Sequence, residues 1–283
     1  NDLLLLERLA PRARTLLGID PIWKGREHEV VHPKISVVGD LLENVDLSSL
    51  LGGSPDLVLC RHTLEHIDDP RLFLQKLLDA AGPETLFVFE FPHLDTLVAR
   101  HRYDHIFHQH VQYFSKQSFA RLLRELGAEI VSWSENPHHW DAFLVAFRKS
   151  ASPAVDVTKE FSMLSAEQIS AGYDRFREKM RITASLLADV APQQAVGFGA
   201  AQMLPVILYH LGGAAGIDTI YDDDPAKHGL SYANLPVVIR TPSSDTDLKE
   251  KTVLITAPDS ARPILCRLGE FGPRAILIPS LVF

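Results

Sequence analysis

Asp56-Leu57-Val58-Leu59-Cys60-Arg61-His62-Thr63-Leu64-Glu65-His66-Ile67-Asp68-Asp69-Pro70 is the stretch that decides the fold. Its opening apolar run is typical of a strand buried on both faces. The segment that follows carries leucines on one side, which predicts a helix; these are Leu72, Leu74, Leu77 and Leu78. The next strand is expected at 85–89. A strand, a helix and a second strand in this order predict a mostly parallel α/β sheet.

The same pattern extends along the chain in both directions. Strands are expected at 15–20 and 35–40, and a helical pattern precedes the first of them. Because an α/β nucleotide-binding unit opens on a strand and a glycine turn, we expect this chain to start inside the first loop of such a unit. Further along, 129–133 and 142–147 are expected to pair as antiparallel strands that close the sheet.

Length predicts two domains. The chain has 283 residues, of which 46% are hydrophobic and 23% charged, as in ordinary globular proteins. We expect a first α/β domain over 1–150, a linker helix over 151–192 and a smaller α/β domain over 193–283. The helical pattern itself runs over 156–190, and we attribute its apolar face to packing.

Charge and cysteine content argue against several classes of protein. A formal net charge of −8 disfavours nucleic acid and anionic membranes as partners. No apolar run approaches the roughly 20 residues of a membrane-spanning helix. The two cysteines, Cys60 and Cys266, lie far apart and build neither a disulfide framework nor a multi-cysteine zinc site. We therefore expect a cytoplasmic protein.

Tyr103-Asp104-His105-Ile106-Phe107-His108-Gln109-His110-Val111-Gln112-Tyr113-Phe114-Ser115, here named the histidine segment, follows a buried strand. Ligands bind where strands end in α/β sheets, and imidazoles can change charge near neutral pH. We interpret the segment as the catalytic part of a group-transfer enzyme. If it is helical, His101, His105 and His108 share one face that can bind zinc; structural or substrate-contact roles are the preferred alternative.

Asp20 and Asp40 stand at the ends of two expected strands. In a nucleotide-binding unit, Asp20 can accept both hydroxyls of a ribose, and Asp40 can reach an adenine amino group. The alternative is that each acid only caps the segment after it. Together with 62–67 after the next strand, the two acids favour a cofactor that contains a nucleoside.

The order of acid, Gly-Asp and Leu-Glu-His-Ile resembles class I S-adenosylmethionine-dependent methyltransferases. Asn1-Asp2 is similar to the end of the glycine-rich loop of the sugar C-methyltransferases, which methylate a ring carbon of a thymidine-diphosphate-linked keto sugar. The histidine segment resembles their catalytic stretch, Tyr-Asp-x-Ile-Tyr-His-Glu-His followed by Tyr-Phe-Ser. This resemblance covers essentially the whole chain. It implies a Rossmann-like methyltransferase domain, S-adenosylmethionine as cofactor and a nucleotide-linked sugar as substrate.

The resemblance also implies residue roles. His110 is the expected base that removes a proton beside the ketone, and His66 is expected to orient the substrate or relay the proton. The other expected catalytic residues are His108, Gln109 and Phe107. The expected cofactor-binding residues are Asp2, Asp20, Pro21, Asp40, Leu41, Arg61, His62, Thr63 and His66. No metal-binding residue is expected.

The second domain begins as a Rossmann-like unit, with a strand, a Gly-x-Gly turn and a helix from 194 onward. By the resemblance it helps to hold the nucleotide-linked sugar, with Gly197, Gly199 and Ala200 around a phosphate. The full set of expected substrate-binding residues is Gly197, Gly199, Ala200, Ala201, Asp222 and Asp223. The third glycine of the dinucleotide fingerprint is missing. An NAD site with Asp222 on the ribose and a scaffold without a ligand are the alternatives.

Two catalytic positions depart from the family pattern. Phe107 replaces the usual tyrosine and removes a hydroxyl donor, and Gln109 replaces the usual glutamate and removes a carboxylate. The family's His-Gly-Gly loop reads His138-His139-Trp140-Asp141 here. A different acceptor, or a methyltransferase-like binding or scaffold protein, is therefore the alternative to sugar methylation.

Overall fold

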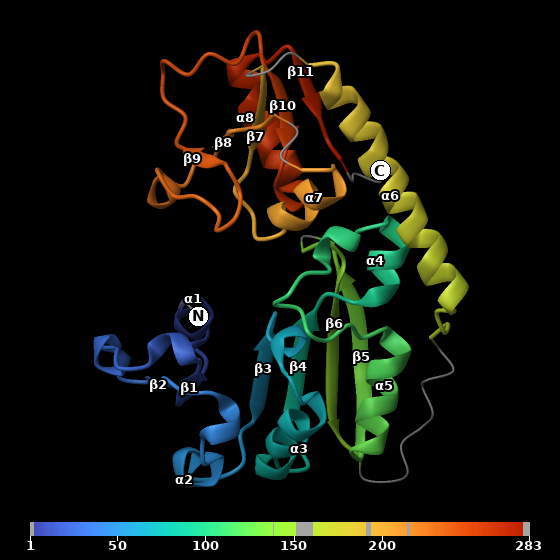
Figure 1. Cartoon of the computed structure of the whole chain (residues 1–283). Coiled ribbons are helices and arrows are strands. Elements are labelled where there is room, and N and C mark those ends of the chain that lie inside the picture. Colours follow the sequence, from blue (N-terminus) through green and yellow to red (C-terminus); the bar gives the residue numbers. More distant parts are fainter. Residues whose placement is uncertain (1–2, 138, 151–160, 191–193, 214–215, 280–283) are drawn as a thin grey trace. The chain divides into compact units, whose positions relative to one another are not determined.

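The computed structural model describes residues 3–137, 139–150, 161–190, 194–213 and 216–279. The chain divides into two compact units (Figure 1). Unit 1 comprises 1–90, 118–134 and 144–159, and unit 2 comprises 91–117, 135–143 and 160–283. The expected boundaries after 150 and 192 remain a prediction; this division places the whole histidine segment in the unit that contains the C-terminal half of the chain.

Unit 1 contains a small parallel sheet of β1 (Leu16–Ile19) and β2 (Ile35–Val38). The helices around it are α1 (Leu4–Leu9), η1 (Pro21–Trp23), η2 (Glu27–Glu29), η3 (Leu42–Asn44) and α2 (Leu47–Leu51). Both strands were predicted, but as parts of one larger sheet, and that was wrong. In a doubly wound sheet another strand lies between this pair and the next pair. The described residues contain no such strand, so the two pairs form separate sheets.

The second sheet has the order β3-β4-β6-β5 and lies mostly in unit 1. Its strands are β3 (Leu57–Arg61), β4 (Leu86–Phe91), β5 (Ala128–Asn136) and β6 (Ala142–Lys149), and its helices are η4 (Leu64–His66), α3 (Pro70–Ala80) and α5 (Lys116–Glu125). β3 and β4 are parallel, with α3 between them in the chain, as predicted. α3 starts at Pro70 because the carboxylate of Asp69 accepts the N–H of Leu72 at 2.9 Å.

Phenylalanines fill the core of unit 1. Phe87 stacks on Phe147 with ring centroids 4.9 Å apart, and Phe89 meets Phe147 edge-on at 5.0 Å. All three side chains are fully buried. Alternate residues of β4 therefore face one aromatic layer, and this packing fixes the register of the strand in the sheet.

Unit 2 contains a five-stranded parallel sheet in the order β11-β10-β7-β8-β9. Its strands are β7 (Ala195–Phe198), β8 (Thr219–Tyr221), β9 (Val238–Arg240), β10 (Thr252–Ile255) and β11 (Ala275–Leu277), and the short helices near them are α7 (Leu204–His210), η7 (Pro225–Lys227), η8 (Pro258–Ser260) and α8 (Ala261–Phe271). The first strand is central, the next two lie on one side and the last two on the other. This is the doubly wound order of a Rossmann-like sheet.

The long helix α6 (Ala166–Ala188) begins at Ser165 with a capping box to Gln168. Its buried residues follow a helical spacing; they are Gly172, Phe176, Met180, Thr183 and Leu187. The core around them also contains Tyr103 and Leu204. The apolar face expected to serve packing does so, but the helix starts later than expected: 161–165 are not helical, and 156–160 lie outside the described residues.

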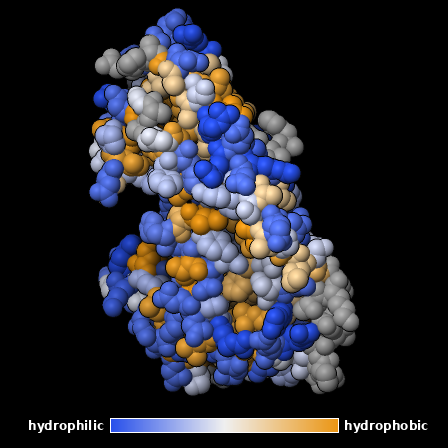
Figure 2. Space-filling view, turned by 45° about the vertical axis from the view of Figure 1, so that its right-hand side comes forward, coloured by the Kyte–Doolittle hydropathy of each residue, from blue (hydrophilic) through white to orange (hydrophobic). Residues whose placement is uncertain are grey.

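No helix in the described part of the chain is both long and apolar enough to cross a membrane. Figure 2 shows one face of the molecule, on which apolar side chains are interspersed with polar ones. Exposed apolar residues on that face thus do not merge into one continuous band.

Candidate functional site

The two strand-end acids of unit 1 lie at one sheet edge. β1 and β2 are parallel with Ile19 opposite Val38, and the N–H of Asp20 donates to the carbonyl of Val38 at 3.1 Å. The carboxylate of Asp20 accepts the N–H of Ile22 at 3.0 Å and caps η1, which Pro21 opens. The capping alternative is therefore realised. It leaves the ribose role as a prediction.

Asp40 is also engaged locally. Its Oδ1 accepts the side-chain amide of Asn44 at 2.9 Å and the N–H of Leu41 at 2.8 Å. These hydrogen bonds, that of Asn44 first, hold the pKa of Asp40 below its ordinary value. The neighbouring Leu41 is 51% exposed. Asp2, also expected to bind the cofactor, lies outside the described residues.

The turn after β3 carries a network that the sequence reasoning missed. Glu65 and Glu90 are each 3% exposed; Glu90 lies near the carboxyl end of β4, opposite Arg61 of β3, and Glu65 lies in η4, which follows β3. Nε of Arg61 donates to Oε2 of Glu90 at 2.5 Å, and His62 lies between the two carboxylates, at 3.5 Å from Glu65 and 3.8 Å from Glu90. The signal was present, since Glu90 interrupts the apolar run of β4.

His62 adopts a left-handed backbone conformation, with φ of 47°. That conformation is uncommon for a residue with a side chain and is found at functional turns. The hydroxyl of Thr63 donates to the carbonyl of Arg61 at 3.0 Å and tightens the same turn. Arg61, His62 and Thr63, all expected at the cofactor, are thus ordered parts of one turn of unit 1.

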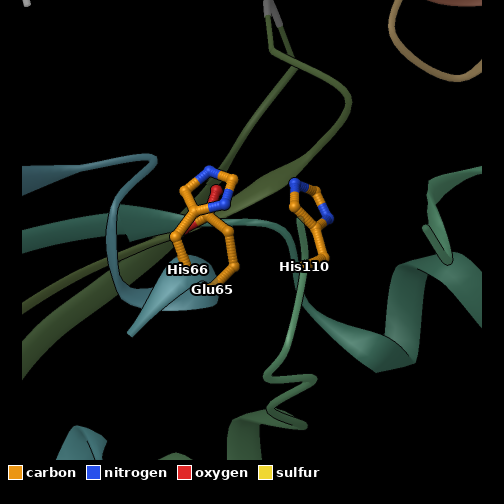
Figure 3. A group of neighbouring side chains, drawn as sticks. All are labelled: Glu65, His66 and His110. Atoms are coloured by element: carbon orange, nitrogen blue, oxygen red, sulfur yellow. The ribbon is translucent and has the colours of Figure 1, made fainter. Parts of the chain in front are cut away.

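Figure 3 shows the side chains of Glu65 and His66, which η4 of unit 1 carries, and that of His110, which belongs to unit 2. Within unit 2, the ring of Phe107 packs on His110 with centroids 4.2 Å apart, and the N–H of His110 donates to the carbonyl of Phe107 at 3.0 Å. His108 and Gln109, between them, are exposed. The local turn therefore sets Phe107 and His110 side by side and points its middle residues to solvent.

The histidine row that was considered for zinc is not formed. α4 (Leu94–Arg100) ends before it, and His101 has a φ of 56° as the C-cap. The next helical turn, η5 (Tyr103–His105), is short and separate. His101, His105 and His108 therefore do not share one helix face, and that alternative was wrong.

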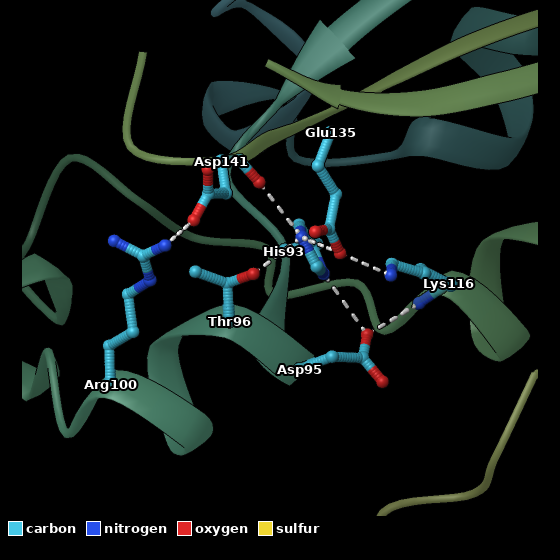
Figure 4. Close-up of polar contacts among 7 residues, drawn as sticks. All are labelled: His93, Asp95, Thr96, Arg100, Lys116, Glu135 and Asp141. Carbon is cyan, nitrogen blue, oxygen red and sulfur yellow. Dashed lines mark hydrogen bonds and ion pairs between the residues drawn. The ribbon is translucent and has the colours of Figure 1, made fainter. Parts of the chain in front are cut away.

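A second missed network surrounds His93 in unit 2 (Figure 4). This side chain is 1% exposed; its Nδ1 lies 3.2 Å from Oδ2 of Asp95, and its Nε2 lies 3.0 Å from the carbonyl of Asp141. Lys116 joins Asp95 through its N–H at 2.8 Å and Glu135 through its Nζ at 2.5 Å. The network fastens the starts of α4 and α5 to the loop at 135–141.

That loop is the one that departs from the family pattern. Asp141 forms an ion pair with Arg100 and, like Trp140, has a positive φ. The ring of Trp140 meets His105 edge-on at 5.3 Å between centroids. His138 lies outside the described residues. Trp140 of this loop thus packs against the start of the histidine segment.

The Gly-x-Gly turn of unit 2 is closely packed. A Cβ on Gly199, whose φ is 97°, would lie 2.5 Å from the Cβ of Ala257, and one on Gly197 would lie 2.9 Å from Ile220. The N–H of Ala200 donates to Oδ2 of Asp222 at 2.7 Å. Close packing is therefore a sufficient reason for both glycines, and the N–H expected to meet a phosphate meets a carboxylate of the chain itself.

The remaining expected substrate residues also have partners within unit 2. Asp222 accepts Nζ of Lys227 at 3.1 Å, and Asp223 accepts Nε of Arg267 at 3.2 Å. The carbonyl of Ala201 accepts the hydroxyl of Tyr232 at 2.9 Å. The phosphate cradle stays a prediction, and a ligand there would have to displace Asp222.

Residues 2–133 match the family model described as a methyltransferase domain. The chain is also similar to C-methyltransferase NovU of Streptomyces niveus, with 30% identity over 120 residues, which is 42% of this chain and 28% of that protein. The matched part thus spans well under a third of the relative. Both similarities agree with the methyltransferase expected from the sequence, and the expected bounds of its domain stay a prediction. S-adenosylmethionine, the cofactor expected from the sequence, is the methyl donor of such α/β domains.

Two solved structures are similar at low identity. Magnesium protoporphyrin IX methyltransferase of Synechocystis PCC 6803 with bound SAH is 14% identical, with 50% of this chain and 68% of that chain covered and a TM-score of 0.38. A putative S-adenosylmethionine-dependent methyltransferase of Listeria monocytogenes is 15% identical, with coverages of 49% and 81% and a TM-score of 0.38. At TM-scores below 0.5, neither carries an argument about this chain.

Proposed function

Starting from a methyltransferase domain over residues 2–133, we propose that the protein transfers a methyl group from S-adenosylmethionine to a carbon of a nucleotide-linked keto sugar. The observation that carries the proposal is the similarity to a protein named a C-methyltransferase. The order of residues in the histidine segment supports it, because that segment resembles the catalytic stretch of sugar C-methyltransferases.

The cofactor binds at the sheet edges of unit 1. Asp20 accepts the ribose hydroxyls and Asp40 reaches the adenine, beside Pro21, Leu41 and the turn 61–63. The residues fit this group: the hydrogen bonds from Leu41 and Asn44 both go to Oδ1 of Asp40, and Leu41 offers an exposed apolar side chain to a flat base. When bound, S-adenosylmethionine supplies an electrophilic methyl group.

His110 acts as the base. An imidazole exchanges protons near neutral pH, so it can take the proton from the carbon beside the ketone. Its packing on Phe107 fixes the plane of the ring and limits the directions from which a substrate carbon can approach. His66 orients the substrate or relays the proton onward.

Phe107 and Gln109 change which hydrogen-bond donors can stabilise the negative charge that develops on the enolate oxygen. A phenylalanine offers no hydrogen-bond donor to an enolate oxygen, whereas the amide of Gln109 offers two N–H groups that a glutamate does not have. His108 and Gln109 are exposed and so remain accessible to a substrate. We therefore expect slow turnover on a standard keto sugar nucleotide.

The test is turnover with a panel of thymidine-diphosphate-linked keto sugars. S-adenosylhomocysteine formation and the mass of the sugar report the transfer, and proton exchange at the substrate carbon reports the first step. His110→Asn is expected to abolish the exchange, while His28→Asn, which changes an exposed histidine of unit 1, is expected to keep it.

Each negative result has a separate meaning. Exchange that persists in His110→Asn would move the base to another residue. Methylation of an acceptor that is no sugar would contradict the sugar substrate but keep the methyltransferase. Absence of any S-adenosylmethionine binding would contradict the whole proposal.

A further inference from the structure

The strand order of unit 2 marks one place in its sheet. β7 is central, the chain continues to β8 and β9 on one side, and it then returns to β10 and β11 on the other. In doubly wound sheets a ligand binds outside the carboxyl ends of the two strands between which this order reverses. Here those strands are β7 and β10, so the place is bounded by 199–203 and 256–260.

This switch point is closed against a pyrophosphate. The hydroxyl of Thr256 donates to the carbonyl of Gly199 at 2.6 Å, and Thr256 is fully buried. The space beside Gly199 is taken by Ala257. The two loops that part in a dinucleotide-binding sheet are therefore bonded and packed together.

Arg102, just before the histidine segment, and His105, at its start, meet Asp259 at the same strand ends. Nη2 of Arg102 lies 2.5 Å from Oδ1 of Asp259, and the guanidinium of Arg102 also holds Asp104 through two hydrogen bonds of 2.8 Å. Nε2 of His105 lies 3.4 Å from Asp259. All four side chains are nearly buried: Arg102 is 12% exposed, Asp259 8%, His105 2% and Asp104 0%. Solvent therefore hardly screens these charges.

The charges support one another. Burial alone would raise the pKa of Asp259, but His105 and Arg102 together hold it below its ordinary value. Burial opposes the charge of Arg102 as well, yet Asp104 and Asp259 raise its pKa. Removing one partner from a buried ion pair leaves an uncompensated charge, so the network forms as a whole or opens as a whole.

Tyr103 fastens the same turn to α6. Its hydroxyl donates to the carbonyl of Ile169 at 2.5 Å, and the side chain fits over Gly172. Residues 102–105 are therefore held on two sides, immediately before the turn that sets Phe107 beside His110. Small displacements of a reacting group cost large factors in rate, so such anchoring matters for catalysis.

We propose that Asp259 is a positioning residue and that the switch point of the C-terminal sheet holds the histidine segment instead of a nucleotide. The sheet keeps the strand order of a nucleotide-binding domain, but residues at the start of the histidine segment occupy the place at which a nucleotide binds in such a domain. The catalytic consequence rests on the proposed function, in which His110 is the base. The anchoring does not, because it concerns contacts within unit 2 alone.

The test is hydrogen exchange of the full chain, in the wild type and in Asp259→Asn. The amides of His105, Ile106 and His110 donate to the carbonyls of Arg102, Tyr103 and Phe107, and they report the order of the segment. Asp259→Asn is expected to speed their exchange about tenfold or more, with α6 unchanged. Asp218→Asn, which alters an exposed aspartate of the same unit, is the matched control and is expected to change nothing. Unchanged exchange in folded Asp259→Asn would overturn the proposal.

Activity gives a second readout. If the wild type transfers methyl groups, kcat of Asp259→Asn is expected to fall by about tenfold to a hundredfold, with the Kd for S-adenosylmethionine retained. Asp259→Glu keeps the charge and is expected to recover part of the loss. A loss of kcat and of cofactor affinity together would show general damage and count against a positioning role.

The two hypotheses fail in different ways. A wild type without transfer on any acceptor contradicts the proposed function, while the exchange experiment still decides the anchoring. If Asp259→Asn does not fold, Arg102→Lys replaces it in the same experiment. It keeps the positive charge but cannot form the two bonds to Asp104, so faster exchange of the segment is again expected. Exchange as slow as in the wild type would overturn the anchoring.

Discussion

Asp20 can serve the fold and a ligand with one carboxylate. It caps η1, so its replacement removes both a cap and the proposed ribose contact. We expect Asp20→Ala to weaken S-adenosylmethionine binding by about 1–3 kcal/mol, the cost of leaving paired polar groups unsatisfied. Titration calorimetry measures this directly.

Asp46 provides the matched control for Asp20. It caps α2 in the same unit by accepting the N–H of Ser48 at 3.1 Å, but no cofactor role is proposed for it. Asp46→Ala is expected to bind S-adenosylmethionine as the wild type does. Equal affinities in the two variants would remove Asp20 from the cofactor site.

Phe107 and Gln109 are the positions at which single side chains can restore a standard constellation. Phe107→Tyr supplies a phenol and Gln109→Glu supplies a carboxylate. Each contact is expected to stabilise the transition state by about 2–4 kcal/mol where the site is preorganised. The double variant should therefore turn over a keto sugar nucleotide faster than the wild type. No gain, with both ligands bound, would argue that the acceptor is not such a sugar.

Helix α6 carries a glycine for a steric reason. A Cβ at Gly172 would lie 2.6 Å from the hydroxyl of Tyr103, which is buried and bonded to Ile169 and cannot swing away. Although alanine favours a helix by about 1 kcal/mol, we expect Gly172→Ala to lower the free energy of unfolding by about 1–3 kcal/mol through overpacking. Urea unfolding provides the measurement.

Gly269 in α8 is the control for that substitution, because no atom lies within 4 Å of an added Cβ there. Gly269→Ala is expected to raise the free energy of unfolding by about 0.5–1 kcal/mol. If both substitutions changed the free energy of unfolding equally, an added Cβ at Gly172 would not be clashing with the hydroxyl of Tyr103.

Elements with a strong local pattern were predictable from the sequence. Apolar runs gave the strands at 57–61 and 86–91 nearly to the residue, and the cap at Asp69 follows from local chemistry. The start of α6 after Ser165 was missed, because the apolar pattern continues before this cap. A missing opening strand was expected, but its consequence, a break between the two sheets of unit 1, was not. The zinc row failed because His101 leaves the helix in a left-handed conformation.

The site was predictable only where a motif carried it. Residues 61–66 and 103–115 stand out by their order in the chain, and Glu90 stands out in an apolar run, whereas the burial of Glu65 and Glu90 became visible only in the fold. The pairing of Arg102 with Asp259 joins residues far apart in the sequence, and each looks ordinary in its own stretch. Such pairings follow from the tertiary fold, so no local pattern could reveal them.

At the scale of the whole molecule, the two units differ in the burial of those acids whose pKa is lowered. In unit 2, burial opposes the charges of Asp95, Asp222 and Asp259, but hydrogen bonds and cations lower the pKa of each below its ordinary value. A carboxylate whose pKa is lower in the folded state contributes stability that is full above its unfolded pKa of about 3.9 and is lost as pH falls toward the folded value. The acids with a lowered pKa in unit 1, such as Asp40 and Asp46, are exposed and contribute less.

We therefore expect acid to open unit 2 before unit 1. As pH falls below about 4, amides of β7 and of the histidine segment should lose protection from hydrogen exchange before those of β3 and β4 do. Asp222→Asn should flatten the dependence of unfolding free energy on pH between about 5 and 3, because it removes one carboxylate that binds a proton more weakly when folded. Asp218→Asn should leave that slope unchanged, since its carboxylate is exposed. Earlier loss of protection in β3 and β4 would show that the carboxylates of unit 1, among them the buried Glu65 and Glu90, govern the response to acid rather than the network around Asp259.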